Sequence, residues 1–101
     1  MYSWTAEDLK CQIGKLFQLY RLRGKLSQLQ LGNELNLSAN HIGRIERAET
    51  NPTIEILIEY CNFFAIDIAL LFTRLSGKEL EEIENEIGHL KIVNKNTISK
   101  K

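Results

Sequence analysis

The stretch that decides the fold is LSQLQLGNELNLSANHIGRIE, residues 26–46. Within it, two short helical patterns lie on either side of a turn. Ser27 is a suitable N-cap for a helix over residues 28–35. Asn36 can adopt the left-handed backbone conformation that most residues resist, and Ser38 can cap a second helix. The stretch therefore predicts a helix-turn-helix.

The second helix of this pair, residues 38–47, has a composition that stability alone does not explain. It opens with SANH, which is poor in helix propensity and rich in hydrogen-bonding groups. Helical periodicity directs Ile42 and Ile45 toward the core. The outward face then carries Ala39, Asn40, Gly43 and Arg44, and we interpret it as a candidate binding surface.

The rest of the chain also predicts helices. Apolar residues at three- and four-residue spacing indicate an amphipathic helix over residues 5–23, which Gly24 ends. Thr53 is a good N-cap for a helix through residue 64. Asp67 is expected to cap a short apolar helix that ends at residue 72. All five predicted helices lie within residues 5–73, which we expect to form one domain.

Length and composition fit a single small all-α domain. With 101 residues, the chain can bury one core without a metal or a disulfide framework. One proline and six glycines favour helices over a turn-rich sheet. Cys11 and Cys61 fall in apolar helical patterns, so we expect buried free thiols. We expect no cofactor and no metal.

The sequence carries no signal for export or for catalysis. The N-terminus lacks the basic start and apolar core of a signal peptide, and no apolar run approaches the roughly 18 residues of a membrane span. We therefore expect a cytoplasmic protein without membrane contact. No nucleophile–base arrangement, metal-ligand spacing or glycine-rich phosphate loop is present, which argues against an enzyme.

Charge is unevenly distributed along the chain. The formal net charge is zero, which by itself argues against a generic nucleic-acid binder. Residues 1–53 nevertheless hold seven Lys and Arg against five Asp and Glu. Residues 76–90 hold one Lys against five Glu, and residues 91–101 hold four Lys and no acid. A zero total can therefore conceal a mildly basic face.

Together, these features resemble the phage-repressor-like, or Xre-type, helix-turn-helix regulators. The similarity covers about residues 13–72, and its parts occur in the family's order. They are Arg21, LSQ at 26–28, Leu31, Leu35, Ser38, the IxxIE run at 42–46, Pro52, Leu57 and DIALLF at 67–72. The chain departs from the family pattern at Gly32, Asn36, Gly43 and Ala48. The resemblance implies a five-helix, lambda-repressor-like domain followed by a C-terminal helix.

The resemblance also implies that helix 38–47 lies in the major groove of double-stranded DNA. Asn40 would then pair with adenine and Arg44 with guanine, while Ala39 touches a thymine methyl group. Gln28 would bring its amide and a helix N-terminus to a phosphate. The candidate DNA-binding residues are Gln28, Ser38, Ala39, Asn40, His41, Gly43, Arg44 and Arg47.

Other polar residues receive different expectations from the resemblance. Arg21 and Glu46 match positions that form an internal ion pair, so we expect a structural role for both. His41 is either a phosphate contact, a partly covered residue or neither. Arg23 and Lys25 are further candidates for backbone contacts, with an ordinary solvated surface as the alternative.

A sixth helix is predicted over residues 76–92, where Ser76 and Glu79 form a capping box. It carries an apolar seam at Leu80, Ile83, Ile87 and Leu90. This seam either forms a homodimer interface, which we expect, or covers the domain of its own chain. Its glutamates should keep it away from DNA. We expect residues 93–101 to be a flexible basic tail.

The sequence thus predicts a sequence-specific DNA-binding regulator, by analogy a repressor, that binds a palindromic operator as a homodimer. Two alternatives share the fold. One is an antitoxin that represses its own operon and holds a toxin. The other is a helix-turn-helix protein-interaction module that does not bind DNA, which the zero net charge and Gly43 would favour.

Overall fold

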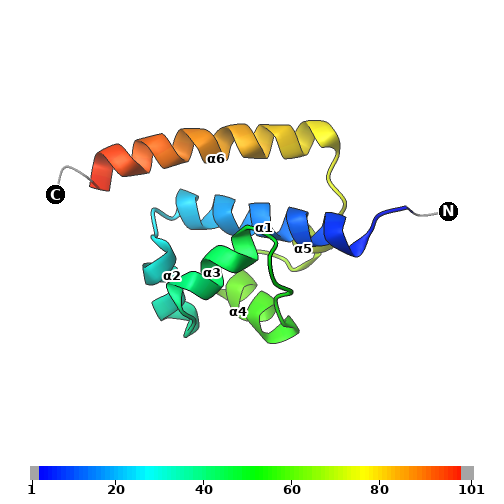
Figure 1. The fold of residues 1–101 in the computed structure, drawn as a ribbon, viewed down its shortest axis with the longest axis horizontal. Coiled ribbons are helices and arrows are strands. Elements are labelled where there is room, and N and C mark those ends of the chain that lie inside the picture. Colours follow the sequence, from blue (N-terminus) through cyan, green and yellow to red (C-terminus); the bar gives the residue numbers. More distant parts are fainter. Residues whose placement is uncertain (1–2, 99–101) are drawn as a thin grey trace.

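The computed structural model describes residues 3–98, and this part of the chain contains six helices and no strand (Figure 1). The predicted all-α class and the helix-turn-helix are therefore confirmed. The helices are α1 (Ala6–Arg23), α2 (Gln28–Leu35), α3 (Ala39–Glu46), α4 (Ile54–Phe64), α5 (Ala69–Phe72) and α6 (Gly77–Ile98).

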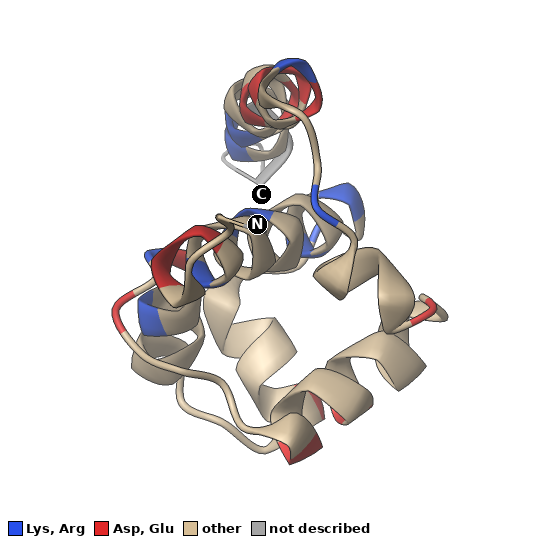
Figure 2. Cartoon of the chain, turned by 90° about the vertical axis from the view of Figure 1, so that its right-hand side faces the viewer, with Lys and Arg blue, Asp and Glu red and all other residues tan. Residues whose placement is uncertain are grey.

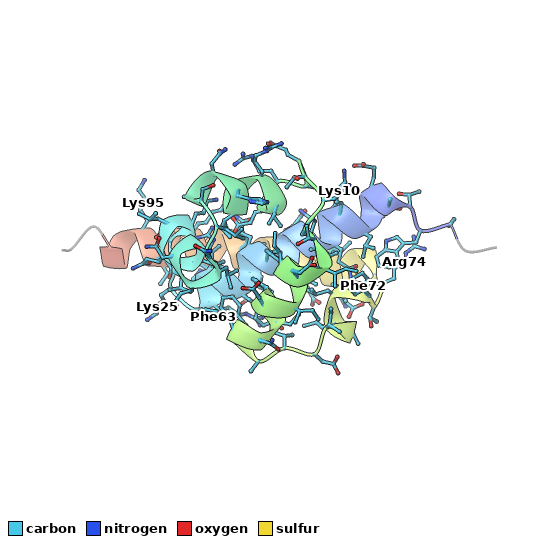
Figure 3. All side chains as sticks on the ribbon, turned by 90° about the horizontal axis from the view of Figure 1, so that it is seen from below. Lys10, Lys25, Phe63, Phe72, Arg74 and Lys95 are labelled. Atoms are coloured by element: carbon cyan, nitrogen blue, oxygen red, sulfur yellow. The ribbon has the colours of Figure 1, made fainter. Side chains whose placement is uncertain are left out.

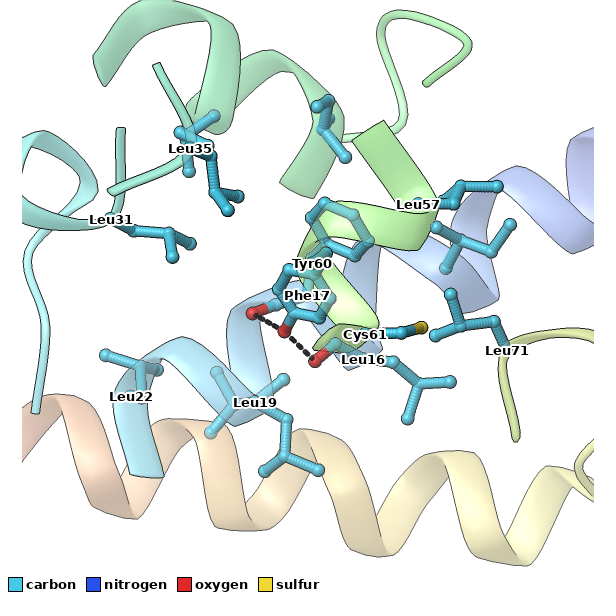
Figure 4. Close-up of a cluster of buried hydrophobic side chains, with 14 residues drawn as sticks. Leu16, Phe17, Leu19, Leu22, Leu31, Leu35, Leu57, Tyr60, Cys61 and Leu71 are labelled. Carbon is cyan, nitrogen blue, oxygen red and sulfur yellow. Dashed lines mark hydrogen bonds between the residues drawn. The ribbon is translucent and has the colours of Figure 1, made fainter. Parts of the chain in front are cut away.

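Helix α1 is the central element of the molecule. Helices α2, α3 and α4 lie on one side of it, and the long α6 runs alongside it on the other (Figure 1). The core between α1 and the smaller helices is apolar (Figure 4). Its fully buried side chains are Phe17, Leu31, Ile42, Ile45, Tyr60 and Leu71.

Tyr60 joins α4 to α1 in the centre of this core. Its ring stacks on Phe17 with ring centroids 3.7 Å apart. Its hydroxyl donates toward the backbone oxygens of Leu16 and Phe17, at 3.1 and 2.8 Å (Figure 4). Burial raises the pKa of the Tyr60 phenol, so the group stays neutral and a donor.

Local capping signals set most helix starts. The hydroxyls of Ser27, Ser38 and Thr53 accept backbone N–H groups in the first turns of α2, α3 and α4, as predicted. The capping box of Ser76 and Glu79 is also formed. The short α5 begins at Ala69, and the carboxylate of Asp67, the predicted cap, accepts the backbone N–H of Ala69 at 2.9 Å.

Four residues other than glycine adopt the left-handed conformation at helix ends. Asn36 does so between α2 and α3 with φ 59°, as predicted. Lys25, Ala48 and Ala65 also have positive φ. Helix α1 does end before Gly24, but Gly24 has φ −79° and the left-handed residue is the next one. These positions carry backbone strain that a glycine would avoid.

The two cysteines lie in different environments. Cys61 is buried, as expected, and burial raises the pKa of its thiol. Cys11 is exposed, so the prediction of two buried thiols is wrong. The reason is the neighbouring Gln12, which takes the inward position on α1 and is 2% exposed. Its amide bonds to backbone atoms of Leu71, Thr73 and Leu75, which fixes the α5–α6 connection to α1.

Helix α6 packs along α1 of the same chain. Ile87 of the predicted seam is buried in the core cluster, and Ile83 and Leu90 are half-buried against it. Leu80 is also half-buried. Part of the seam therefore packs on the domain of its own chain, while Leu80, Ile83 and Leu90 remain partly exposed. A homodimer through this seam remains a prediction.

Helix α6 is also longer than predicted. It continues to Ile98, and Asn94 is buried with its amide donating to the backbone oxygen of Leu22 at 2.9 Å. Residues 93–98 thus belong to this helix, whereas we expected the tail to begin at residue 93. Residues 99–101 lie outside the described part of the chain. No helix described here is long and apolar enough to cross a membrane.

Candidate nucleic-acid interface

The outer side of α3 presents two polar side chains to solvent. Asn40 and Arg44 are exposed, and neither side chain has a hydrogen bond or an ion pair within residues 3–98. Ile42 and Ile45 on the opposite side are 0% and 1% exposed. The predicted division of α3 into a core side and an outer side is therefore present, and Asn40 and Arg44 lie one helical turn apart.

Gly43 does not lie open on this outer face, in contrast to the prediction. It is buried, because side chains from neighbouring positions cover it. A Cβ added there would lie 2.9 Å from Nη1 of Arg47 and 3.2 Å from Nε2 of Gln28. The lack of a side chain at Gly43 thus leaves space for the Gln28 side chain to lie against α3. Gly43 therefore has a packing role.

Gln28 takes part in a buried polar network between α1, α2 and α3. Its Nε2 donates to Oε1 of Glu46 at 3.2 Å. The same carboxylate accepts from Nε and Nη2 of Arg21, at 2.6 and 3.1 Å. Nη1 of Arg21 also donates to the backbone oxygen of Leu26. The predicted ion pair between Arg21 and Glu46 is confirmed, and it ties the start of α2 and the end of α3 to α1.

Two glycines set how closely α3 approaches the helices beside it. A Cβ on Gly14 of α1 would lie 2.7 Å from the backbone oxygens of Ile45 and Glu46. A Cβ on Gly32 of α2 would overlap the backbone oxygen of Leu37 in the turn before α3. Only glycine permits these close backbone contacts. The orientation of α3 on the domain therefore depends on both positions.

The beginning of α3 is fixed by its cap. The Ser38 hydroxyl accepts the backbone N–H of His41 at 3.0 Å, and Ser38 itself is exposed. Ala39 and His41 are half-buried beside it. The N-terminal half of α3 is therefore rigidly placed, with a small apolar residue and an imidazole next to Asn40.

Arg47 follows α3 and is engaged locally. Its Nε donates to Oε2 of Glu49 at 2.8 Å, and about half of each side chain is exposed. This hydrogen bond raises the pKa of Arg47 and lowers the pKa of Glu49. Arg47 can contact a phosphate only if its ion pair with Glu49 breaks. The free energy required is small, because solvent screens the pair.

The sequence did not reveal the bond between Gln28 and Glu46 or the inward position of Gln12. Both side chains bond to groups that are distant in the sequence, separated by 18 residues for Gln28 and by 59 or more for Gln12. The only local signal was the place of Gln12 in the apolar repeat of α1, next to Ile13.

Comparison with known proteins agrees with this geometry. The family described as Helix-turn-helix matches residues 17–71, which is more than half of the chain. The match begins within α1 and ends within α5, so it includes the polar network and the whole of α2 and α3. No curated protein and no solved structure matches the chain significantly. The chain belongs to the helix-turn-helix family and is an Xre-type, DNA-binding regulator.

Proposed function

We propose that this protein is a sequence-specific transcriptional repressor that reads the major groove of its operator with α3. The observation that carries the proposal is the exposed pair Asn40 and Arg44, which lie one turn apart on α3 and have no side-chain hydrogen bond or ion pair in the described residues. Stability of α3 does not require an amide or a guanidinium at these exposed positions. Both groups, however, can bind the edge of a base through two hydrogen bonds.

Each residue of α3 has a distinct role in the proposed complex. Asn40 pairs with N6 and N7 of adenine, and Arg44 pairs with O6 and N7 of guanine. Each such pair discriminates against a wrong base by about 1–3 kcal/mol. Ala39, beside Asn40, contacts a thymine methyl group.

Residues around α3 position the protein on the DNA backbone. Gln28 uses one hydrogen of its Nε2 for Glu46, and the second hydrogen remains for a phosphate oxygen. The N-terminus of α2 offers backbone N–H groups to the same phosphate. Ser38, His41 and Arg47 supply further contacts, which carry no sequence information themselves.

We further propose that two copies bind a palindromic operator. One domain of this size makes few phosphate contacts, and the net charge of zero adds no general attraction. Two linked copies on half-sites about 34–36 Å apart gain affinity without new contacts. Repression needs only that the bound protein occupies the operator, so it requires no additional activity.

A second candidate is a protein-interaction module, of which a toxin-binding antitoxin is one form. Exposed apolar side chains on α4 and α5 favour it. Ile54 is 73% exposed and Phe72 44%. Both line a groove of about 390 Å³ that also contacts Leu57. A protein bound in this groove would leave the outer face of α3 accessible to DNA. The two candidate functions therefore exclude each other only if the protein does not bind DNA.

Selection of bound sequences from a random double-stranded DNA pool tests the proposal. The intact protein should return a palindromic motif with an adenine and a guanine in each half-site. Selections with Asn40→Ala and with Arg44→Ala should each lose preference at one position per half-site. Asn62→Ala, an exposed amide on α4, is the matched control and should return the original motif. Failure to enrich any motif would refute the repressor proposal and favour the protein-interaction module.

A further inference from the structure

An open groove lies between the α1–α2 turn and the C-terminal part of α6. Its volume is about 420 Å³, with Leu22 and Leu26 among its lining residues. Lys25, Lys91 and Lys95 also line it, and all three are exposed. Figure 3 shows Lys25 and Lys95 projecting from the same end of the molecule. In the described part of the chain, none of these lysines has an ion pair.

The position of these lysines is fixed by the packing of α6 on α1. The bond between the Asn94 amide and the Leu22 backbone oxygen holds the groove side of α6 against the end of α1. Lys91 and Lys95 are one turn apart on the same side of α6 and flank Asn94. The two ammonium groups are therefore presented by a helix whose end is anchored, which lowers the entropy that binding costs.

Charge is separated along α6. Five glutamates lie in its first half, which is the near end of α6 in Figure 2. Two of them are paired with α1, Glu84 with Lys15 and Glu86 with Arg23. The lysine end lies at the opposite end of the helix. The repulsion that led us to expect α6 away from DNA therefore acts on its first half only.

The groove continues into the proposed DNA-binding surface. Ser27 and Gln28, which begin α2, line it together with the lysines. Gln28 is also the residue that lies over Gly43 of α3. A DNA strand whose phosphate meets the first turn of α2 would thus pass next to Lys91 and Lys95.

We propose that the C-terminal part of α6 is a second contact surface for the DNA backbone, with Lys91 and Lys95 binding phosphates next to the one at α2. The inference rests on the proposed function and extends it beyond the residues that match the family. We assign the operator strand as the ligand for two reasons. The lysines have no ion pair in the described residues, and the groove adjoins the surface on which DNA would contact α2 and α3. The C-terminal helix then adds affinity that does not depend on sequence.

The salt dependence of operator binding tests this proposal. The slope of log K against log salt concentration is measured for the intact protein and for Lys91→Gln and Lys95→Gln. Each variant should lower the magnitude of the slope by about 0.9, and the double variant by about 1.8, since each lost phosphate contact releases one counterion fewer. The preferred DNA sequence should not change. Melting temperatures check that the variants stay folded.

Lys78→Gln is the matched control, because Lys78 is exposed and lies about 20 Å from Lys91 and about 25 Å from Lys95 along α6. It should leave the slope unchanged. Unchanged slopes for Lys91→Gln and Lys95→Gln, or an equal change for Lys78→Gln, would overturn the proposal. If the groove instead binds a small anionic ligand, the slopes for Lys91→Gln and Lys95→Gln should be unchanged. If the intact protein selects no DNA sequence, the proposed function has failed, which differs from the failure of this inference alone.

Discussion

The Arg21–Glu46 pair allows the sharpest test of how α3 is held. The side chains are 8% and 3% exposed, and three nitrogen donors surround the carboxylate. Arg21→Met removes two of those donors and leaves the Glu46 carboxylate buried with only Gln28 as a donor. Glu46→Leu conversely leaves the guanidinium without its partner.

The burial of the pair sets the magnitude. Removing one partner of a buried ion pair costs about 3–5 kcal/mol, because the remaining charge stays desolvated. For a domain of this size, such a loss lowers Tm by roughly 15–30 °C. The double variant removes both charges, so its cost should be smaller than the sum of the single costs by about 2–3 kcal/mol.

The assay is chemical and thermal unfolding of the intact protein, the two single variants and the double variant. The exposed pair Arg47 and Glu49 provides a control cycle with Arg47→Met and Glu49→Leu, for which the coupling should be too small to resolve. Strict additivity for Arg21 and Glu46, or equal coupling in the two cycles, would refute the argument that this pair holds α1 and α3 together.

Thermal unfolding of single variants also tests three other features. Gly14→Ala should lower Tm, because its Cβ would lie 2.7 Å from two backbone oxygens of α3. This loss should outweigh the helix preference of alanine over glycine, which is about 1 kcal/mol. An unchanged Tm would contradict the close approach of α1 and α3. Ala65→Gly should stabilise the fold by about 1 kcal/mol, because Ala65 has φ 56°; a loss of stability would argue against strain there. The hydrogen bond from Arg23 lowers the pKa of Glu86. The stability that Glu86→Gln removes should therefore be present at neutral pH and disappear as the pH falls below the ordinary Glu value of about 4.3; a difference that does not depend on pH would exclude this linkage.

Helix boundaries and turns could be predicted because their causes are local. Ser27, Ser38 and Thr53 accept N–H groups from residues three positions later. Asn36 takes its left-handed conformation within a single turn. These signals act over four residues, so they are visible in the sequence without knowledge of the tertiary fold.

Partners that are distant in the sequence could not be predicted in the same way. The seam of α6 fits any apolar surface, so its pattern alone could not choose between α1 and a second copy. Asn94 shows the same limit, because only its bond to Leu22, 72 residues away, shows that the helix end is anchored.

In the candidate site, too, positions set by local sequence could be predicted, whereas positions set by distant partners could not. Asn40 and Arg44 could be placed outward from helical periodicity alone, since Ile42 and Ile45 fix the inward side. Gly43 could not, because its burial depends on the side chain of Gln28 from another helix. The resemblance identified the pair of Arg21 and Glu46, but not the third donor that Gln28 provides.

Arg44→Lys tests most directly whether α3 recognises bases through Asn40 and Arg44. Binding constants are measured for a selected operator and for operators with single base changes, at several salt concentrations. Lysine keeps the charge but loses the planar, bidentate geometry of the guanidinium. The variant should therefore keep the salt slope and lose about 1–3 kcal/mol of discrimination at one guanine position per half-site, with no change elsewhere. An Arg44→Lys protein that retains the full preference at every base position would contradict the account.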